Sequence, residues 1–251
     1  MRYGYVSITG KVRDSDEDSI LAISCEAVSE GQGEGRFLGV VADGMGGGEY
    51  GEVASRIATV SFRNILGPYV LRGKCIKGEI REQMEKSFEK ANSEILQFAK
   101  RNNLYLMGTT ATAAFVCGDS VVIGNMGDSR AYLFDENGKL LFRTKDHSRA
   151  MELVEKGEIS EKDSRLDYRR NELTRFLGMD FDCSPDFYEL HFTGKESILL
   201  CCDGLWGSMD EEEIGELVVT DVPEQIIANE MANRANINDG SDNISLILVR
   251  S

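Results

Sequence analysis

Six acidic residues stand at the ends of β-like stretches of this chain. Each lies beside a short apolar run or in the turn between two such runs, and they are Glu17, Asp18, Asp43, Asp128, Asp203 and Asp242. If these strand ends meet at one rim, the carboxylates share one cleft and repel one another unless a counterion is present. Magnesium and manganese prefer carboxylate, carbonyl and water oxygens. The pattern therefore predicts a site for hard divalent cations.

Other interpretations of the same residues stay open at this level. A single Asp beside Gly or Asn is more often a turn residue than a ligand. The glycine-rich stretch GMGGG after Asp43 lets the backbone approach a metal closely, which makes the Gly44 carbonyl a candidate ligand. It could instead cradle a phosphate in a dinucleotide-binding turn, but it lacks the G-x-G-x-x-G spacing. Zinc is disfavoured, because the chain has only two histidines and no thiolate cluster.

The elements that would position these residues are short strands and a few amphipathic helices. Strands are predicted at 19–24, 37–42, 110–116, 120–125, 130–134, 196–202 and 243–249. Helices are predicted at 79–101, 210–219 and 223–235, and after the glycine-rich loop with Val53, Ile57 and Val60 facing inward. Consecutive strands without intervening helices favour an α+β fold of antiparallel sheets covered by helices over a doubly wound parallel sheet.

The composition limits the class of protein. The chain has 251 residues, of which 41% are hydrophobic, and no linker or repeat divides it, so we expect one globular domain over residues 1–251. The net charge of −15 argues against a nucleic-acid-binding surface. The six cysteines form no C-x-x-C pair and most lie in apolar runs, which favours free thiols in a reducing cytoplasm. No signal peptide or membrane-spanning run is recognisable, so we expect a soluble, cytoplasmic protein without a membrane partner.

Seven segments in one order carry a resemblance to a known family. They are GKVRDSDEDS, VADGMGGG, GTTATAAFVCGDSVVIGNMGDSRAYLF, KDHS, RRNELTRFLG, LLCCDGLW and SDNISLILV, which extend from about residue 10 to residue 249. In these segments the chain resembles the metal-dependent protein phosphatases of the 2C type, in particular their compact bacterial members. The resemblance implies a four-layer α-β-β-α sandwich, in which helices flank two mostly antiparallel sheets, with a small flap at about residues 146–179.

The resemblance also implies which residues form the metal site. They are Asp43, Gly44, Asp203, Asp242, Glu17, Asp18 and Asp128. Asp43 would bridge two ions, Mn²⁺ or Mg²⁺, and the Gly44 carbonyl would complete one site. The aspartates of the DGLW and SDN motifs would hold the other ion, and the acidic pair near the start would act largely through bound waters. Asp128, with Asp203, would bind a third, weaker ion.

The implied reaction is hydrolysis of phosphoserine and phosphothreonine by a water that two ions, ~3.5–4 Å apart, activate for in-line attack. Arg13 falls where the family has an arginine that grips the substrate phosphate, and its planar guanidinium suits that task. Met45 stands where animal members place a histidine, so leaving-group protonation is expected from water at the metals. His147 is expected to be a structural turn histidine.

Two departures and one charged cluster complete the comparison with the family pattern. Asp16 stands where bacterial relatives usually carry Asn, which is expected to alter a local hydrogen bond rather than the chemistry. The flap holds the basic residues Arg165, Arg169, Arg170 and Arg175. They either contact the phosphopeptide or neutralise neighbouring acids, and for any single Arg the second role is favoured.

Three functions are compatible with these residues to different degrees. The first is an active serine/threonine phosphoprotein phosphatase, monomeric and opposing a cognate Ser/Thr kinase, and the residues favour it. The second is a catalytically inactive member of the family that serves as a binding module, which would lack a metal aspartate. The third is another metal-dependent hydrolase on an unrelated parallel sheet with a nucleotide at the glycine-rich loop.

Overall fold

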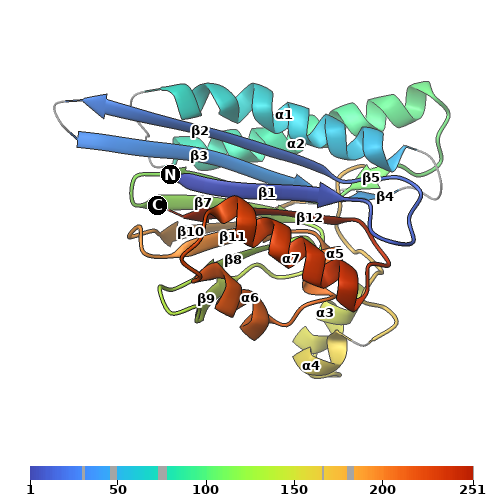
Figure 1. The fold of residues 1–251 in the computed structure, drawn as a ribbon. Helices are drawn as coiled ribbons and strands as arrows, with labels where there is room; N and C mark the ends of the chain where they lie inside the picture. The colour runs from blue at the N-terminus through green and yellow to red at the C-terminus, as the bar shows by residue number, and fades with distance from the viewer. Residues whose placement is uncertain (30–31, 46–49, 73–77, 166, 180–183, 251) are drawn as a thin grey trace.

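Two five-stranded antiparallel sheets lie face to face in the computed structural model of this chain (Figure 1). The structure describes all residues except 30–31, 46–49, 73–77, 166, 180–183 and 251, so Gly46 to Gly48 of the glycine-rich loop lie outside the described residues. The first sheet has the order β10-β7-β6-β3-β2 and the second the order β1-β12-β11-β8-β9. All their neighbouring strands are antiparallel. The alternative of a parallel sheet around a nucleotide is therefore wrong.

The strands of both sheets are short except for one long hairpin. The first sheet contains β2 (Ser19–Ser29), β3 (Gln32–Ala42), β6 (Ala111–Cys117), β7 (Ser120–Met126) and β10 (Asp186–His191). The second contains β1 (Arg2–Ile8), β8 (Arg130–Phe134), β9 (Leu140–Arg143), β11 (Ser197–Cys201) and β12 (Ile244–Arg250). A separate two-stranded ribbon pairs β4 (Gly44–Met45) with β5 (Gly108–Thr109). The seven predicted strands are confirmed, while β1, β9 and β10 were not predicted.

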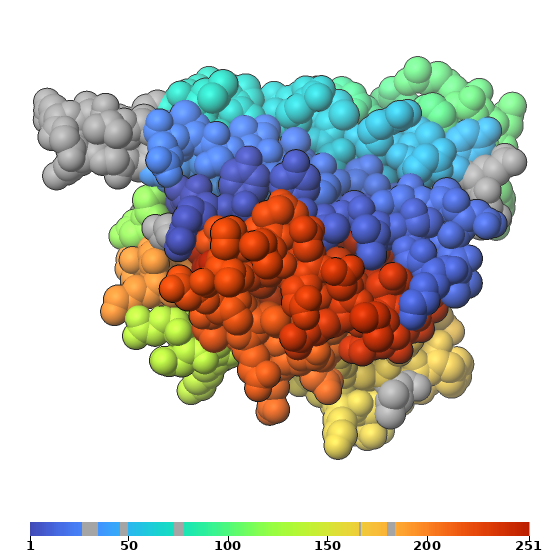
Figure 2. All heavy atoms as spheres, in the orientation of Figure 1, coloured from blue at the N-terminus to red at the C-terminus, as the bar shows by residue number. Residues whose placement is uncertain are grey.

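Helices cover the outer face of each sheet, which confirms the four-layer arrangement. Helices α1 (Gly51–Leu71) and α2 (Glu79–Arg101) lie on the first sheet. Helices α5 (Asp203–Trp206), α6 (Glu211–Val218) and α7 (Glu224–Asn238) lie on the second. In Figure 2 the C-terminal helices, coloured orange to red, cover one face of the molecule.

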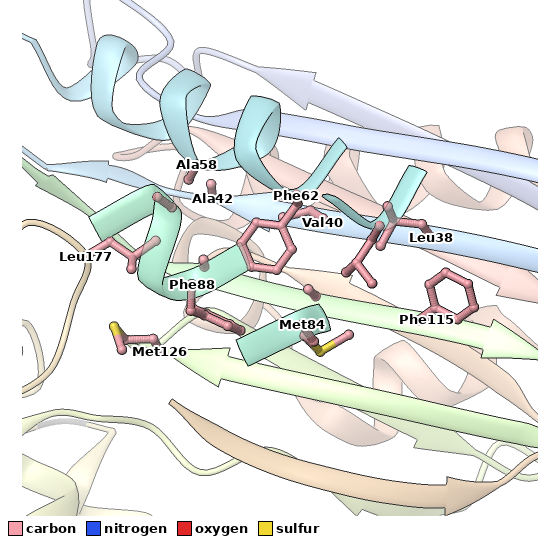
Figure 3. Packing of buried hydrophobic residues seen from close by; sticks show 14 of the residues in the cluster. Leu38, Val40, Ala42, Ala58, Phe62, Met84, Phe88, Phe115, Met126 and Leu177 are labelled. Carbon is pink, nitrogen blue, oxygen red and sulfur yellow. The ribbon is translucent and has the colours of Figure 1, made fainter. Parts of the chain in front are cut away.

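The buried face of α1 differs from the prediction. Val53, Ile57 and Val60 are only half-buried, whereas Ala54, Ala58 and the Phe62 one turn further on are fully buried. Small residues let the helix approach the sheet closely, and a search for large β-branched residues misses such a face. Phe62 then meets Phe88 of α2 edge to face, with ring centroids 4.9 Å apart, in the same cluster as Leu38 and Val40 of β3 (Figure 3).

The predicted flap contains two short helices among its described residues. These are α3 (Arg149–Glu155) and α4 (Glu161–Ser164), and each begins after a serine whose hydroxyl accepts a hydrogen bond from the backbone. The flap, yellow in Figures 1 and 2, stands at one edge of the molecule. No helix within the described parts of the chain is both long and apolar enough to cross a lipid bilayer.

The cysteines follow the prediction only in part. Cys25, Cys201 and Cys202 are free thiols, and the last two are buried. Cys117, at the end of β6, is disulfide-bonded, so the expectation of free thiols is wrong there. Cys75 and Cys183 lie outside the described residues.

Candidate metal centre

One cavity of about 300 Å³ collects the predicted residues from distant parts of the chain. Of the predicted site residues, its lining includes Arg13, Glu17, Asp43, Gly44, Asp128, Asp203 and Asp242. Asp18 lies just beneath them, since its carboxylate, that of Asp43 and the Cys202 sulfur place ligand atoms within 4.8 Å of one another. The structure thus brings together residues that are more than 200 positions apart in the sequence.

Asp43 is held at the end of β3 by its own backbone. Its N–H donates to Oγ1 of Thr110 at 3.0 Å, and its carbonyl accepts from the Thr110 N–H at 2.9 Å and from Oγ1 of Thr109 at 2.8 Å. The next residue must be glycine, because a Cβ at Gly44 would lie 2.3 Å from the carbonyl oxygen of Gly51. Gly44 therefore presents only backbone atoms, and no side chain, next to Asp43.

Several carboxylate oxygens in this site are buried without a partner. Among the described residues, neither side-chain oxygen of Asp18 has a hydrogen-bond partner, and the same is true of Oδ1 of Asp203. Buried polar atoms are almost always satisfied in folded proteins. These buried carboxylate oxygens lack donors and lie close to other carboxylates. A hard divalent cation binds to such oxygens, so the residues present fit Mn²⁺ or Mg²⁺.

The electrostatics of the metal-free protein lead to the same conclusion. Burial, followed by the charges of neighbouring acids, raises the pKa of Asp18 to about 7 and that of Asp203 to about 6. Burial and the charges of Asp18 and Asp203 also raise the pKa of Asp43 well above its ordinary value. Burial and the charge of Asp203 raise the pKa of Asp128 in the same direction. Bound cations would stabilise the ionised forms of these groups.

Asp242 and Glu17 are joined by an asparagine that the sequence reasoning did not single out. Oδ1 of Asp242 accepts from the backbone N–H of Asn243 at 2.9 Å, and the side chain of Asn243 accepts from the N–H of Glu17 at 2.9 Å. Its amide also donates to the carbonyls of Thr9 and Ser15, at 3.0 Å each. Asn243 therefore fastens the loop after β1 to the start of β12.

Arg13 and Asp16 occupy the same loop with different partners. Nη2 of Arg13 lies 2.8 Å from Oδ2 of Asp242, and the Arg13 side chain is 52% exposed at the cavity. Asp16 accepts from the hydroxyl of Ser7 at 2.6 Å and from the N–H of Asp18 at 3.1 Å. Asp16 therefore ties Ser7 of β1 to the backbone of Asp18.

The flap arginines differ from one another. Arg165 pairs with Asp210, Arg169 with Asp167, and Arg175 with Asp186. Arg170 is in no ion pair of the described residues and donates instead to the carbonyl of Arg165 at 2.8 Å and to the side chain of Asn171. Its hydrogen-bond partner Asn171 lines the cavity, and the charge of Arg170 lowers the pKa of Asp203.

His147 has the surroundings of a structural residue. Its Nδ1 accepts from the backbone N–H of Gly127 at 3.2 Å, and burial lowers the pKa of the imidazole to about 4. His147 is also absent from the cavity lining, in which Met45, Thr110, Asn171 and Leu173 take part instead. Sequence reasoning missed the last three, because an uncharged side chain in a flap or between strands carries no pattern of its own.

Comparison with known proteins decides the family. The model of the family described as protein phosphatase 2C matches residues 7–244. The chain belongs to the protein phosphatase 2C family. It is 34% identical to the serine/threonine phosphatase stp of Listeria monocytogenes over 96% of this chain and 92% of the relative. It is 29% identical to the protein phosphatase PhpP of Streptococcus pneumoniae, with 86% of each chain covered.

Solved structures agree with this membership. The catalytic domain of the serine threonine protein phosphatase PstP, in complex with two manganese ions, superposes with a TM-score of 0.81 at 27% identity. The match covers 98% of this chain and 96% of that one. This protein phosphatase 2C member is therefore a serine/threonine protein phosphatase of a metal-dependent family.

Proposed function

We propose that the cavity is the active centre of this phosphatase and that Asp43 is the shared ligand of two divalent cations, Mn²⁺ or Mg²⁺. The Gly44 carbonyl, Asp203 and Asp242 would be the other direct ligands, and the acidic pair Glu17 and Asp18 would act through water. Asp128 and Asp203 are available to a third, weaker ion. The observation that carries the proposal is the set of buried carboxylate oxygens of Asp18 and Asp203 that lack partners beside Asp43.

The residues of the chain bind and orient the phosphate monoester in this proposal. Bound cations supply positive charge and lower the pKa of the attacking water. Arg13 donates its N–H groups to the phosphoryl oxygens, which its exposure at the cavity permits. Met45 lines the cavity, but a thioether has no proton to give, so water protonates the leaving oxygen.

The test is Mn²⁺-stimulated hydrolysis of p-nitrophenyl phosphate by the wild type and by Asp43→Ala. We expect Asp43→Ala to lose at least about 10³-fold in kcat, because the two cations lose their common ligand. Asp119→Ala is the matched control, since this aspartate is 67% exposed and lies outside the cavity lining. It should retain wild-type activity.

Two outcomes would contradict the proposal. One is an Asp43→Ala variant that keeps its Mn²⁺-stimulated activity. The other is a folded wild-type protein without any metal-stimulated hydrolysis, which would favour the binding module instead.

We propose further that the substrates are cytoplasmic phosphoproteins carrying phosphoserine or phosphothreonine, among them an autophosphorylated Ser/Thr kinase. The protein acts as a monomer, and its net charge of −15 disfavours nucleic acid as a partner. Loss of phosphate from an autophosphorylated Ser/Thr kinase only when Mn²⁺ is present would support this assignment. An unchanged kinase under conditions that hydrolyse p-nitrophenyl phosphate would exclude it.

A further inference from the structure

A buried arginine lies directly behind the acidic cavity. The side chain of Arg130, on β8, is 3% exposed and forms two parallel hydrogen bonds with Asp146, from Nε to Oδ1 at 2.8 Å and from Nη2 to Oδ2 at 2.7 Å. Its Nη1 donates to the hydroxyl of Tyr132 at 3.0 Å. Asp146 is the first residue of the flap, so this ion pair fastens the base of the flap to the second sheet.

The same guanidinium lies over the ring of a tryptophan. The carbon at its centre is 3.7 Å from the ring centroid of Trp206, the last residue of α5. The indole Nε1–H then donates to the backbone carbonyl of Asp128 at 2.9 Å. Trp206 therefore connects the turn that carries Asp128 to the short helix that begins with Asp203.

The flap reaches this tryptophan from a second side. Nη2 of Arg165 donates to the carbonyl of Trp206 at 2.6 Å and to the carbonyl of Met209 at 3.1 Å. The last residue of α5 is thus held twice, by the turn at Asp128 and by the flap. A four-residue helix has too few internal hydrogen bonds to hold its own orientation.

Stability alone gives little reason for such an arrangement. A buried ion pair loses so much hydration that well-packed apolar residues are often equally stabilising. What the pair does supply is a single geometry, because two planar forks and a planar ring fit together in one way. That geometry reaches the turn of Asp128 through the indole hydrogen bond, and the helix that begins with Asp203 through Trp206 itself.

We propose that Arg130 and Trp206 are positioning residues for the phosphatase reaction. They hold Asp128 and Asp203 at the separation that cation binding needs, and they tie that separation to the flap through Asp146 and Arg165. The inference rests on the proposed function, in which Asp128 and Asp203 are metal ligands.

Two variants test it by Mn²⁺ titration of the metal-free protein in a calorimeter. Trp206→Phe keeps an aromatic face under the guanidinium but removes the donor to Asp128. Arg130→Lys keeps the buried charge but loses the planar fork. Each should weaken Mn²⁺ binding about tenfold, the scale typical of groups that orient metal ligands. The chain has one tryptophan, so the emission of Arg130→Lys reports on Trp206 alone, and its response to Mn²⁺ should need about tenfold more metal.

The control must separate positioning from loss of stability. Phe62→Leu weakens the core between α1 and α2, away from the cavity, and should lower the melting temperature without changing Mn²⁺ affinity. If Arg130→Lys does not fold, Trp206→Phe decides. Wild-type Mn²⁺ affinity in Trp206→Phe, or an equal loss of affinity in Phe62→Leu, would overturn the inference. Asp43→Ala distinguishes the two proposals, since unchanged Mn²⁺ binding there would defeat the metal centre itself rather than its positioning.

Discussion

Asp18 is one of the buried carboxyl groups of this site that lie close to other acids. Both of its carboxylate oxygens are buried without a hydrogen-bond partner among the described residues, and Asp16 adds a further acidic group behind it. In the metal-free protein, burial and like charges hold its pKa at about 7. An ordinary carboxyl group has a pKa of about 4, so this one binds a proton far more tightly in the folded than in the unfolded chain.

The metal-free protein should therefore become less stable as the pH rises. The folded state binds more protons at Asp18 and Asp203 than the unfolded state does, so protonation of these carboxyls stabilises the fold. This contribution is complete below a pH of about 4. It is lost as the pH rises through their folded pKa values of about 6 and about 7. We expect the melting temperature in a chelator to fall between about pH 5 and about pH 8. Asp18→Asn, which cannot titrate, should show a shallower fall. A melting temperature that rises over this range would contradict the account.

At the scale of single elements, the site depends on ties between segments rather than on any one motif. The loop after β1 reaches the cavity because Asn243 holds it, and the start of β4 reaches it because Thr110 fixes Asp43. The flap contributes Asn171 and Leu173 to the same cavity. Its arginines include one, Arg170, without an acidic partner in the described part of the chain.

Arg170 is expected to bind the phosphopeptide, unlike its neighbour. Arg170→Ala should raise KM for a phosphothreonine peptide about tenfold, which corresponds to one lost charge-assisted hydrogen bond, and should change kcat little. Arg169→Ala is the control, because this arginine is already paired with Asp167 at 2.8 Å. Steady-state kinetics of both variants at saturating Mn²⁺ check the prediction. Equal KM values for the two would show that Arg170 does not bind the peptide.

The elements that could be predicted are those whose pattern matches their burial. The helix at 79–101 was placed with its observed bounds, because Ile80, Met84 and Phe88 form one buried stripe. Strand β1 was not predicted, because its one buried position is Gly4, where a Cβ would lie 2.3 Å from the backbone of Glu224. Because the residue buried against helix α7 is a glycine, the sequence of this strand does not show the alternation of apolar and polar side chains that predicts a strand.

The candidate site was predictable to a similar extent. The acidic residues stand beside apolar runs, so the strand pattern made a shared rim plausible, and the resemblance to the family supplied their expected roles. Asn243 and Trp206 could not be found in this way, because their roles arise from hydrogen bonds to segments far away in the sequence. Such partners exist only once the sheets have packed.

At the scale of the whole molecule, the two sheets share one interior. Phe37 and Val41 of the first sheet pack in one cluster with Leu200 and Ile247 of the second. The cavity lies beside strand ends of both sheets, since Asp43 directly follows β3 and Asn243 directly precedes β12. The positions of the metal-site carboxylates therefore depend on the packing of the sheets.

The chain should unfold in one step if it is a single domain. Calorimetry and circular dichroism are expected to show one coincident thermal transition. Leu200→Ala, at a fully buried site of the interface, should lower the free energy of unfolding by about 2–5 kcal/mol and shift the whole transition. Two separate transitions, only one of which moves in Leu200→Ala, would instead indicate two domains.

The most direct test of the metal centre is anomalous X-ray scattering from crystals of the protein grown with Mn²⁺. The account predicts two strong manganese peaks in the cavity, both in contact with the Asp43 carboxylate and close to Asp203 and Asp242. It would be contradicted by a cavity without manganese, or by ions bound at acidic residues elsewhere on the surface.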